Sequence, residues 1–227
     1  MSTWSKAHSV GPQRASGIRI WRLCGLIVAF GWPYLPMGTS PSLASVHGDI
    51  IVIGIEWAVT CVLALIGFLL LRRSPGFFGL RGVGVRDMLS LLGLFVATYI
   101  VMGIVTRFLP LQTSALDLQR VASVPFFLRL GLVLTAGICE EFIYRGFVLA
   151  ELADWTGSLW LGAFLSWVLF VLAHIGRYGF TTGLVIPAIV GAAITLLYVW
   201  RRNLPACMLM HALFDGLTIL LLPVLLK

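Results

Sequence analysis

Charged residues are scarce in this chain. Only 11% of its 227 residues are Asp, Glu, Lys or Arg, whereas 59% are hydrophobic, and the mean hydropathy is +1.00. Soluble domains are usually about 25% charged and about 45–50% apolar. The shortage of charge therefore excludes an ordinary soluble domain and predicts a polytopic membrane protein. The length suits one helical bundle rather than two domains.

Cysteine is also scarce, and its spacing forms no recognisable pattern. The four cysteines lie in apolar segments without CxxC spacing, at Cys24, Cys61, Cys139 and Cys207. Neither a disulfide framework nor a zinc–thiolate site is therefore indicated. The H-E-x-x-H signature of zinc proteases is absent from the sequence as well.

Apolar segments suited to transmembrane helices of about 20 residues dominate the rest of the chain. They cover residues 20–37, 50–71, 88–109, 126–150, 158–176, 181–200 and 206–226. We predict an all-α, polytopic transmembrane helix bundle of about seven spans, within a range of roughly six to eight. Residues 1–18 are expected to be a disordered cytoplasmic segment and residues 19–227 a single transmembrane domain. Alternatively, residues 19–45 are a signal peptide, because arginines precede their apolar run and small residues follow it.

The basic residues indicate an orientation. If the N-terminus is cytoplasmic, ten Lys and Arg side chains fall on that side and five on the other, which favours this topology. The basic link Arg72–Asp87 then serves to fix the topology. Basic residues at the ends of apolar segments are typical of membrane proteins, so the net charge of +7 predicts no nucleic-acid partner. We expect a multi-pass integral protein of a prokaryotic inner (plasma) membrane, given the short chain and its basic N-terminus.

Three motifs place ionisable residues in apolar segments, where each costs about 2.5–3.5 kcal/mol. They are EEFIYR with Glu140, Glu141 and Arg145, FVLAH ending at His174, and HALFD with His211 and Asp215. On a helix, Glu141 and Arg145 are spaced to pair, and so are His211 and Asp215. Glu140 points about 100° away from Glu141.

Each motif taken alone fits a structural ion pair, an interfacial histidine or a packing hydrogen bond. Together they predict a site, because three separate helices supply its groups. Arg145 can hold Glu141 as an anion, which leaves Glu140 to accept and donate protons. Glu56, one turn into the second span, is interpreted as structural or interfacial.

The site has no Ser or Cys nucleophile paired with a base, and its groups resemble those that activate water. A Glu can deprotonate a water molecule that attacks a carbonyl, while a His orients the water or stabilises the oxyanion. Alternatively, a divalent metal such as Zn²⁺ binds Glu140, His174, His211 and Asp215. The cofactor is therefore expected to be either none or such a metal.

In this order the motifs, of the form E-E-x-x-x-R, F-x-x-x-H and H-x-x-x-[ND], resemble those of the CPBP family. That family holds the CAAX prenyl endopeptidases of the Rce type and the bacterial Abi proteins. The resemblance covers about residues 126–220 and implies an intramembrane endopeptidase. It implies that Glu140 and His174 activate water, that Glu141 and Arg145 brace Glu140, and that His211 and Asp215 face the oxyanion.

Position 215 departs from the prenyl endopeptidases, which carry Asn there. An ionised Asp would repel an oxyanion, so Asp215 must be protonated, orient His211 or bind metal. A second difficulty is depth, because His211 lies only about six residues past a turn. It would then be shallower than Glu140, unless helices tilt or the fourth helix protrudes.

The expected partners are the lipid bilayer and a membrane-associated protein or peptide substrate, prenylated or not. One alternative is a non-catalytic relative that acts as an immunity or regulatory binding partner. Another is a proton- or ion-coupled transporter, since intramembrane carboxylates and histidines also form proton relays. The absence of similar halves in the sequence disfavours a transporter.

Overall fold

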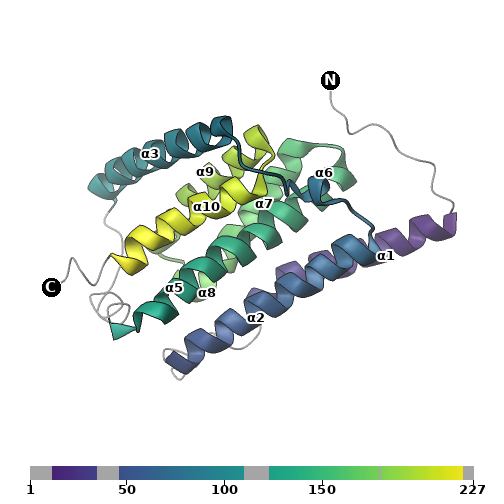
Figure 1. Ribbon diagram of the computed structural model, residues 1–227, viewed down its shortest axis with the longest axis horizontal. Helices are drawn as coiled ribbons and strands as arrows, with labels where there is room; N and C mark the ends of the chain where they lie inside the picture. Colours follow the sequence, from purple (N-terminus) through teal and green to yellow (C-terminus); the bar gives the residue numbers. More distant parts are fainter. Residues whose placement is uncertain (1–11, 35–45, 110–122, 179, 222–227) are drawn as a thin grey trace.

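The computed structural model describes residues 12–34, 46–109, 123–178 and 180–221. These residues are mostly helical and include no strand, which confirms the predicted all-α class. The helices run roughly alongside one another (Figure 1). α1 and α2 lie on one side of the molecule, α3 lies on the other, and the remaining helices lie between them.

The α-helices follow the predicted apolar segments. Their bounds are α1 (Pro12–Gly31), α2 (Val46–Leu65), α3 (Val85–Phe108), α5 (Phe126–Thr135), α6 (Leu149–Thr156), α7 (Leu159–Ala173), α8 (Ile175–Tyr178), α9 (Val185–Arg201) and α10 (Leu204–Asp215). The 3-10 segments are η1 (Trp32–Tyr34), η4 (Pro75–Phe78) and η7 (Thr182–Leu184). The π-helical segments are η3 (Ile66–Leu70), η5 (Ala136–Glu140), η6 (Phe142–Val148) and η8 (Gly216–Leu220).

Each of the predicted segments contains a helix, but the boundaries differ. α1 begins at Pro12, within the segment up to residue 18 that was expected to be disordered. Proline is favourable in the first turn of a helix, because its missing N–H would lack a helical partner there. Residues 1–11 lie outside the described residues.

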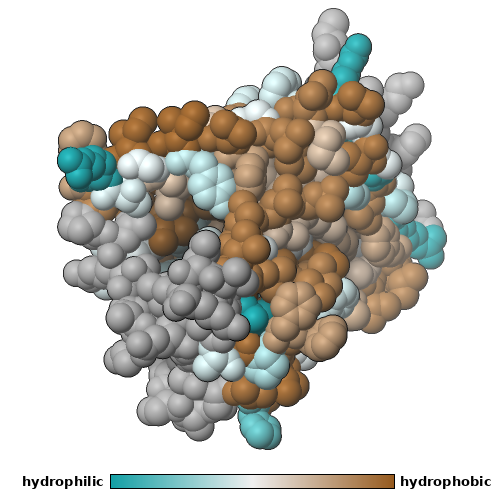
Figure 2. Space-filling model, turned by 60° about the vertical axis from the view of Figure 1, so that its left-hand side comes forward, coloured by the Kyte–Doolittle hydropathy of each residue, from teal (hydrophilic) through white to brown (hydrophobic). Residues whose placement is uncertain are grey.

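Three described helices are long and apolar enough to cross a membrane, namely Val46–Leu70, Val85–Phe108 and Thr182–Arg201. Hydrophobic side chains also cover most of the face seen in Figure 2. Exposed aromatic side chains lie toward both ends of the bundle, Trp155, Trp160 and Trp200 toward one and Phe108, Phe127 and Phe180 toward the other. Such belts are typical of the two membrane interfaces.

Small residues bring α7 close to the helix before it. A Cβ atom on Gly162 would lie 2.7 Å from the backbone nitrogen of Ala153, so only glycine permits this approach. One turn further on, the Ser166 hydroxyl donates a 2.6 Å hydrogen bond to the Tyr144 carbonyl. The close contact expected from these two small residues is therefore present.

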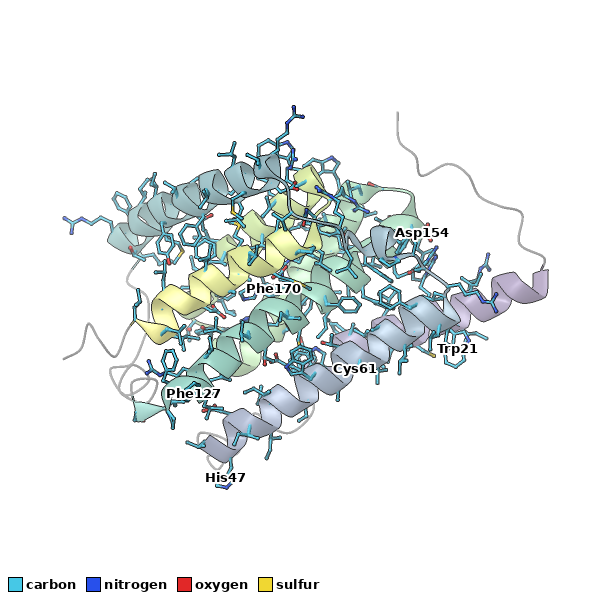
Figure 3. All side chains as sticks on the ribbon, in the orientation of Figure 1. Trp21, His47, Cys61, Phe127, Asp154 and Phe170 are labelled. Atoms are coloured by element: carbon cyan, nitrogen blue, oxygen red, sulfur yellow. The ribbon has the colours of Figure 1, made fainter. Side chains whose placement is uncertain are left out.

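Two buried carboxylates hold one end of the bundle together. Glu151 of α6 accepts hydrogen bonds from Arg22 of α1 (2.8 Å) and Arg73 of the link after η3 (2.9 and 3.0 Å). Both arginines also bond to Asp154, which Figure 3 places at this end. In the same way, Asp87 at the start of α3 receives bonds from Arg81, Arg201 and Asn203.

The basic link Arg72–Asp87 therefore does more than fix the topology. Arg73 and Arg81 each bridge to another helix, and the Gly79 carbonyl accepts a 2.8 Å bond from the Leu204 amide at the start of α10. Residues 72–87 thus join α2, α3, α6 and α10 at one end of the bundle.

The fourth helical stretch is long, which resolves the difficulty of depth. It runs from Phe126 to Thr156 through α5, η5, η6 and α6. Leu204, the first residue of α10, lies against Gly146, so α6 continues about 15 Å beyond the start of α10 at about 1.5 Å per residue. This protrusion allows His211 to lie level with the EEFIYR motif.

Glu151→Gln is expected to destabilise the fold, because it leaves two arginines without their shared carboxylate. We expect the free energy of unfolding to fall by about 3 kcal/mol, the low end for one partner of a buried ion pair, since Asp154 remains. Reversible denaturation in mixed detergent measures it. Arg86→Gln is the control, because Arg86 is exposed and makes no side-chain bond to the described residues. Equal stabilities of the two variants would contradict the expected role of Glu151.

Candidate active site

All six predicted site residues lie close together within the bundle. Glu140, Glu141 and Arg145 come from the π-helical part of the fourth stretch, His174 directly follows α7, and His211 and Asp215 belong to α10. Phe170, whose ring interacts with three of these residues, lies near the middle of the molecule in Figure 3. Wide π-helical turns are rare in proteins and often occur at functional sites.

Glu141 is the centre of the arrangement. Its side chain is fully buried, and its Oε1 atom accepts two hydrogen bonds. One comes from Arg145 Nη1 at 2.8 Å and the other from His211 Nδ1 at 2.7 Å. The predicted pair of Glu141 and Arg145 is therefore present. Its second partner was not predicted, because 70 residues separate Glu141 from His211.

Arg145 connects this carboxylate to α9. The buried guanidinium donates to the Gly191 carbonyl at 2.8 Å and to the Thr195 hydroxyl at 3.3 Å. It also lies 4.3 Å from the centre of the Phe170 ring, as a cation–π contact. Gly191 makes room for both side chains, since a Cβ atom there would lie 2.8 Å from Phe170.

His211 reaches Glu141 because α10 packs closely on η5. A Cβ atom on Gly137 would lie 3.1 Å from Ala212 and from the Met208 carbonyl. Since a carboxylate only accepts hydrogen bonds, Nδ1 of His211 carries the proton in its bond to Glu141. Nε2 is thereby directed to the other side, where Asp215 Oδ2 lies 3.6 Å away.

Glu140 and His174 form the second half of the site. The His174 Nε2 atom lies 4.0 Å from Glu140 Oε2, and both side chains are partly exposed, at 21% and 15%. His174 Nδ1 donates to the Phe170 carbonyl at 2.8 Å, so a neutral ring presents a lone pair at Nε2. Glu140 Oε2 makes no hydrogen bond to the described residues.

The structure corrects one predicted role. Glu141 and Arg145 were expected to brace Glu140, yet the hydrogen bonds of Glu141 go to Arg145 and His211. The reason is the turn of the helix, which directs neighbouring side chains to different partners. Glu141 faces α10, whereas Glu140 faces His174. The buried Glu141 carboxylate therefore positions the imidazole ring of His211.

The metal alternative finds no matching geometry among the described residues. Within them, no group of three or more His, Cys, Asp or Glu side chains is arranged to hold a metal ion. The four residues that were considered as ligands do not fit a metal site in this arrangement.

Two further polar side chains near the site were not predicted. Glu56 of α2, interpreted from the sequence as structural or interfacial, interacts electrostatically with Glu140, His211 and Asp215. The hydroxyl of Tyr144 is buried, one turn after Glu140. For Glu56 the usable signal was its presence as the only charged residue between positions 50 and 71, since such residues usually face a cavity or a partner. For Tyr144 the sequence gave no signal.

Fold and site together define a class, an apolar helical bundle with an interior site of carboxylates and imidazoles. The comparison with protein families gives the particular family. Residues 122–217 match the family model described as "Type II CAAX prenyl endopeptidase Rce1-like", and all six site residues lie in this segment. Over this segment the chain is similar to the Rce1-like family, which confirms the resemblance to CPBP proteins. The curated proteins gave no match, and neither did the solved structures.

The match supports a CAAX protease-like enzyme at the level of the family. Together with the apolar helices, it indicates an integral membrane protein.

Arg145→Leu is expected to lower the free energy of unfolding by about 3–5 kcal/mol, because it leaves the buried Glu141 carboxylate without its cation. Adding Glu141→Leu removes that stranded charge, so the double variant should regain most of the loss. Chemical denaturation in mixed detergent measures both variants.

Arg129→Leu serves as the control for this series. Arg129 is a buried arginine of the same helical stretch, but its hydrogen bonds go to backbone carbonyls, so its loss strands no anion. A double variant no more stable than Arg145→Leu would contradict the assignment of Glu141 as a buried carboxylate.

Proposed function

We propose that this protein is an intramembrane endopeptidase that hydrolyses a peptide bond of a membrane-associated protein or peptide with water activated by Glu140 and His174. The observation that carries the proposal is the pairing of these two side chains. Their facing atoms are 4.0 Å apart, and neither makes a hydrogen bond there. Such a separation suits a water molecule hydrogen-bonded to both groups.

In the proposed reaction, Glu140 is the general base. It takes one proton of the water, while Nε2 of His174 accepts a hydrogen bond from the other and orients the molecule. The oxygen of the water adds to the scissile carbonyl carbon. Glu140 then returns its proton to the amide nitrogen as the carbon–nitrogen bond breaks, which leaves a carboxylic acid and an amine.

Glu141, His211 and Asp215 are suited to the charge that develops on the carbonyl oxygen. Glu141 fixes Nδ1 of His211, so an Nε2–H of this ring is held in place as a donor to the oxyanion. Asp215, 3.6 Å from that nitrogen, can balance the charge of the doubly protonated ring. Preorganised donors of this kind are worth about 3–4 kcal/mol in a transition state.

The substrate is proposed to lie at the membrane. Polar groups converge inside an apolar bundle, and the family is that of CAAX prenyl endopeptidases. A prenylated C-terminus and an unmodified membrane peptide are both compatible with the site. The arginines bound to Glu151 and Asp87 gather at one end of the bundle, which supports a cytoplasmic position for that end.

Cleavage by purified protein tests this proposal. A fluorogenic library of prenylated and unmodified membrane peptides is incubated with wild type, Glu140→Gln and His174→Ala. Loss of a general acid–base group is expected to lower kcat/KM about 100- to 10,000-fold. His47→Ala is the control, because His47 is exposed at an end of the bundle (Figure 3), and it should retain wild-type activity.

Three outcomes of this experiment would redirect the proposal. Wild-type cleavage by both site variants would exclude the assigned residues. Activity lost with a strong zinc chelator and restored by Zn²⁺ would replace the Glu–His mechanism by a metal-dependent one. If a broad library is never cleaved, a non-catalytic binding role becomes the better description.

Asp215→Asn is expected to keep cleavage within about tenfold of wild type. An amide can still contact His211 and can donate a hydrogen bond to an oxyanion. Asp215→Leu can do neither, so we expect its kcat/KM to fall about 100-fold, as when one oxyanion donor is lost. Equal rates for the two variants, measured on the best library peptide, would remove Asp215 from the mechanism.

A further inference from the structure

Glu56 is a buried carboxyl group on a helix outside the matched family segment. α2 is strongly apolar, yet Glu56 is only 7% exposed and lies on the same face as the buried Thr60 and Leu63. This face packs against α5, η5 and η6. Glu56 therefore points into the bundle, away from the surrounding lipid.

The packing of α2 places Glu56 beside the site. Its neighbour Trp57 donates a 3.0 Å hydrogen bond from Nε1 to the Thr135 hydroxyl, five residues before Glu140. This bond sets the position of α2 along the fourth helical stretch. Glu56 is accordingly within electrostatic range of Glu140, His211 and Asp215.

A structural explanation does not account for Glu56. Buried polar side chains in folded proteins almost always have hydrogen-bond partners, and each structural carboxylate at the end of this bundle has several. Glu56 makes no hydrogen bond to the described residues. Burial of a carboxyl group that has no hydrogen bond from the protein costs free energy, and a contribution to the site would account for this cost.

Several buried polar atoms in the same region lack a hydrogen-bond partner among the described residues, including Thr60 Oγ1 and Glu141 Oε2. Glu140 Oε2 and the Tyr144 hydroxyl are both buried and have no hydrogen-bond partner among the described residues. Tyr144 interacts electrostatically with Glu56 and Glu140. The Cys139 thiol also interacts electrostatically with Glu56 and Glu140. The titratable groups that face Glu56 are therefore Glu140, Tyr144, Cys139, His211 and Asp215.

We propose that Glu56 is a positioning residue of the peptidase site, which in its protonated form donates a hydrogen bond to the Glu140 carboxylate. Such a bond orients one oxygen of Glu140 and leaves the other directed at the water beside His174. Glutamine at position 56 could make the same bond through its amide, whereas leucine could not. This inference rests on the proposed peptidase function.

Kinetics and stability of two variants distinguish positioning from structure. Glu56→Leu removes an unpaired buried carboxyl, so its Tm should equal or exceed that of wild type. Its kcat should fall about 10- to 100-fold, as when a residue that orients a reacting group is lost, while KM stays within about threefold. Glu56→Gln should keep kcat within about threefold of wild type. Thr60→Val, on the same face of α2, should leave kcat unchanged.

The outcomes separate the two proposals. If Glu140→Gln abolishes cleavage but Glu56→Leu keeps the wild-type kcat, only the role of Glu56 is wrong. If Glu56→Leu lowers Tm and kcat together and Glu56→Gln does not restore them, Glu56 is structural. If Glu140→Gln cleaves at the wild-type rate, the peptidase mechanism fails.

Infrared spectroscopy provides a readout that needs no substrate. A protonated Glu56 should give a carboxyl C=O band that is absent in Glu56→Gln. In Glu140→Leu the band should move to higher frequency, because its hydrogen-bond partner is gone. A spectrum without a band that depends on Glu56, or a band that Glu140→Leu does not shift, would overturn the inference.

Discussion

One buried oxygen atom, Oε1 of Glu141, joins the parts of the site. It accepts hydrogen bonds from Arg145 and from His211, and Arg145 in turn bonds to the backbone and to Thr195 of α9. Three helical elements are thus tied to a single charge. An isolated anion in such surroundings would be very costly, so the helices must pack in the one arrangement that supplies its partners. The position of His211 follows from that requirement.

The same device recurs at one end of the bundle. Glu151 and Asp87 each collect arginines from helices that are distant in the sequence. In a lipid environment the hydrophobic effect does little to bring apolar helices together, and small residues and polar contacts determine their packing. Carboxylate–arginine clusters therefore hold one end and the middle of this bundle, while Gly137, Gly162 and Gly191 allow close approach between the helices.

Much of the fold was predictable because it depends on local properties. Apolar runs predicted the helices, and the spacing of Glu141 and Arg145 predicted an ion pair between them. The six candidate site residues were chosen from three motifs, each of which lies along one helical stretch. The family resemblance implies that these residues meet in space. That could be tested only once the helices were placed relative to one another.

What could not be predicted depends on packing between helices. The hydrogen bond from His211 to Glu141 joins residues that are 70 positions apart in the sequence. No local sequence pattern shows which carboxylate an imidazole will contact. The π-helical turns around Glu141 leave no periodic signal in so apolar a segment. Glu56 was interpreted as structural or interfacial because its neighbours in sequence are apolar, and only the packing of α2 reveals its electrostatic interactions with Glu140, His211 and Asp215.

The protonation of His211 is the most direct test of the central role of Glu141. Nitrogen-15 NMR of histidine-labelled protein in lipid nanodiscs reports which ring nitrogens carry protons, and the spectrum of His211→Gln identifies the signals. We predict a protonated Nδ1 whose nitrogen-15 chemical shift is that of a strong hydrogen bond to a carboxylate. In Glu141→Gln this bond should be weaker. An unprotonated Nδ1 in wild type, or signals that Glu141→Gln leaves unchanged, would contradict this prediction.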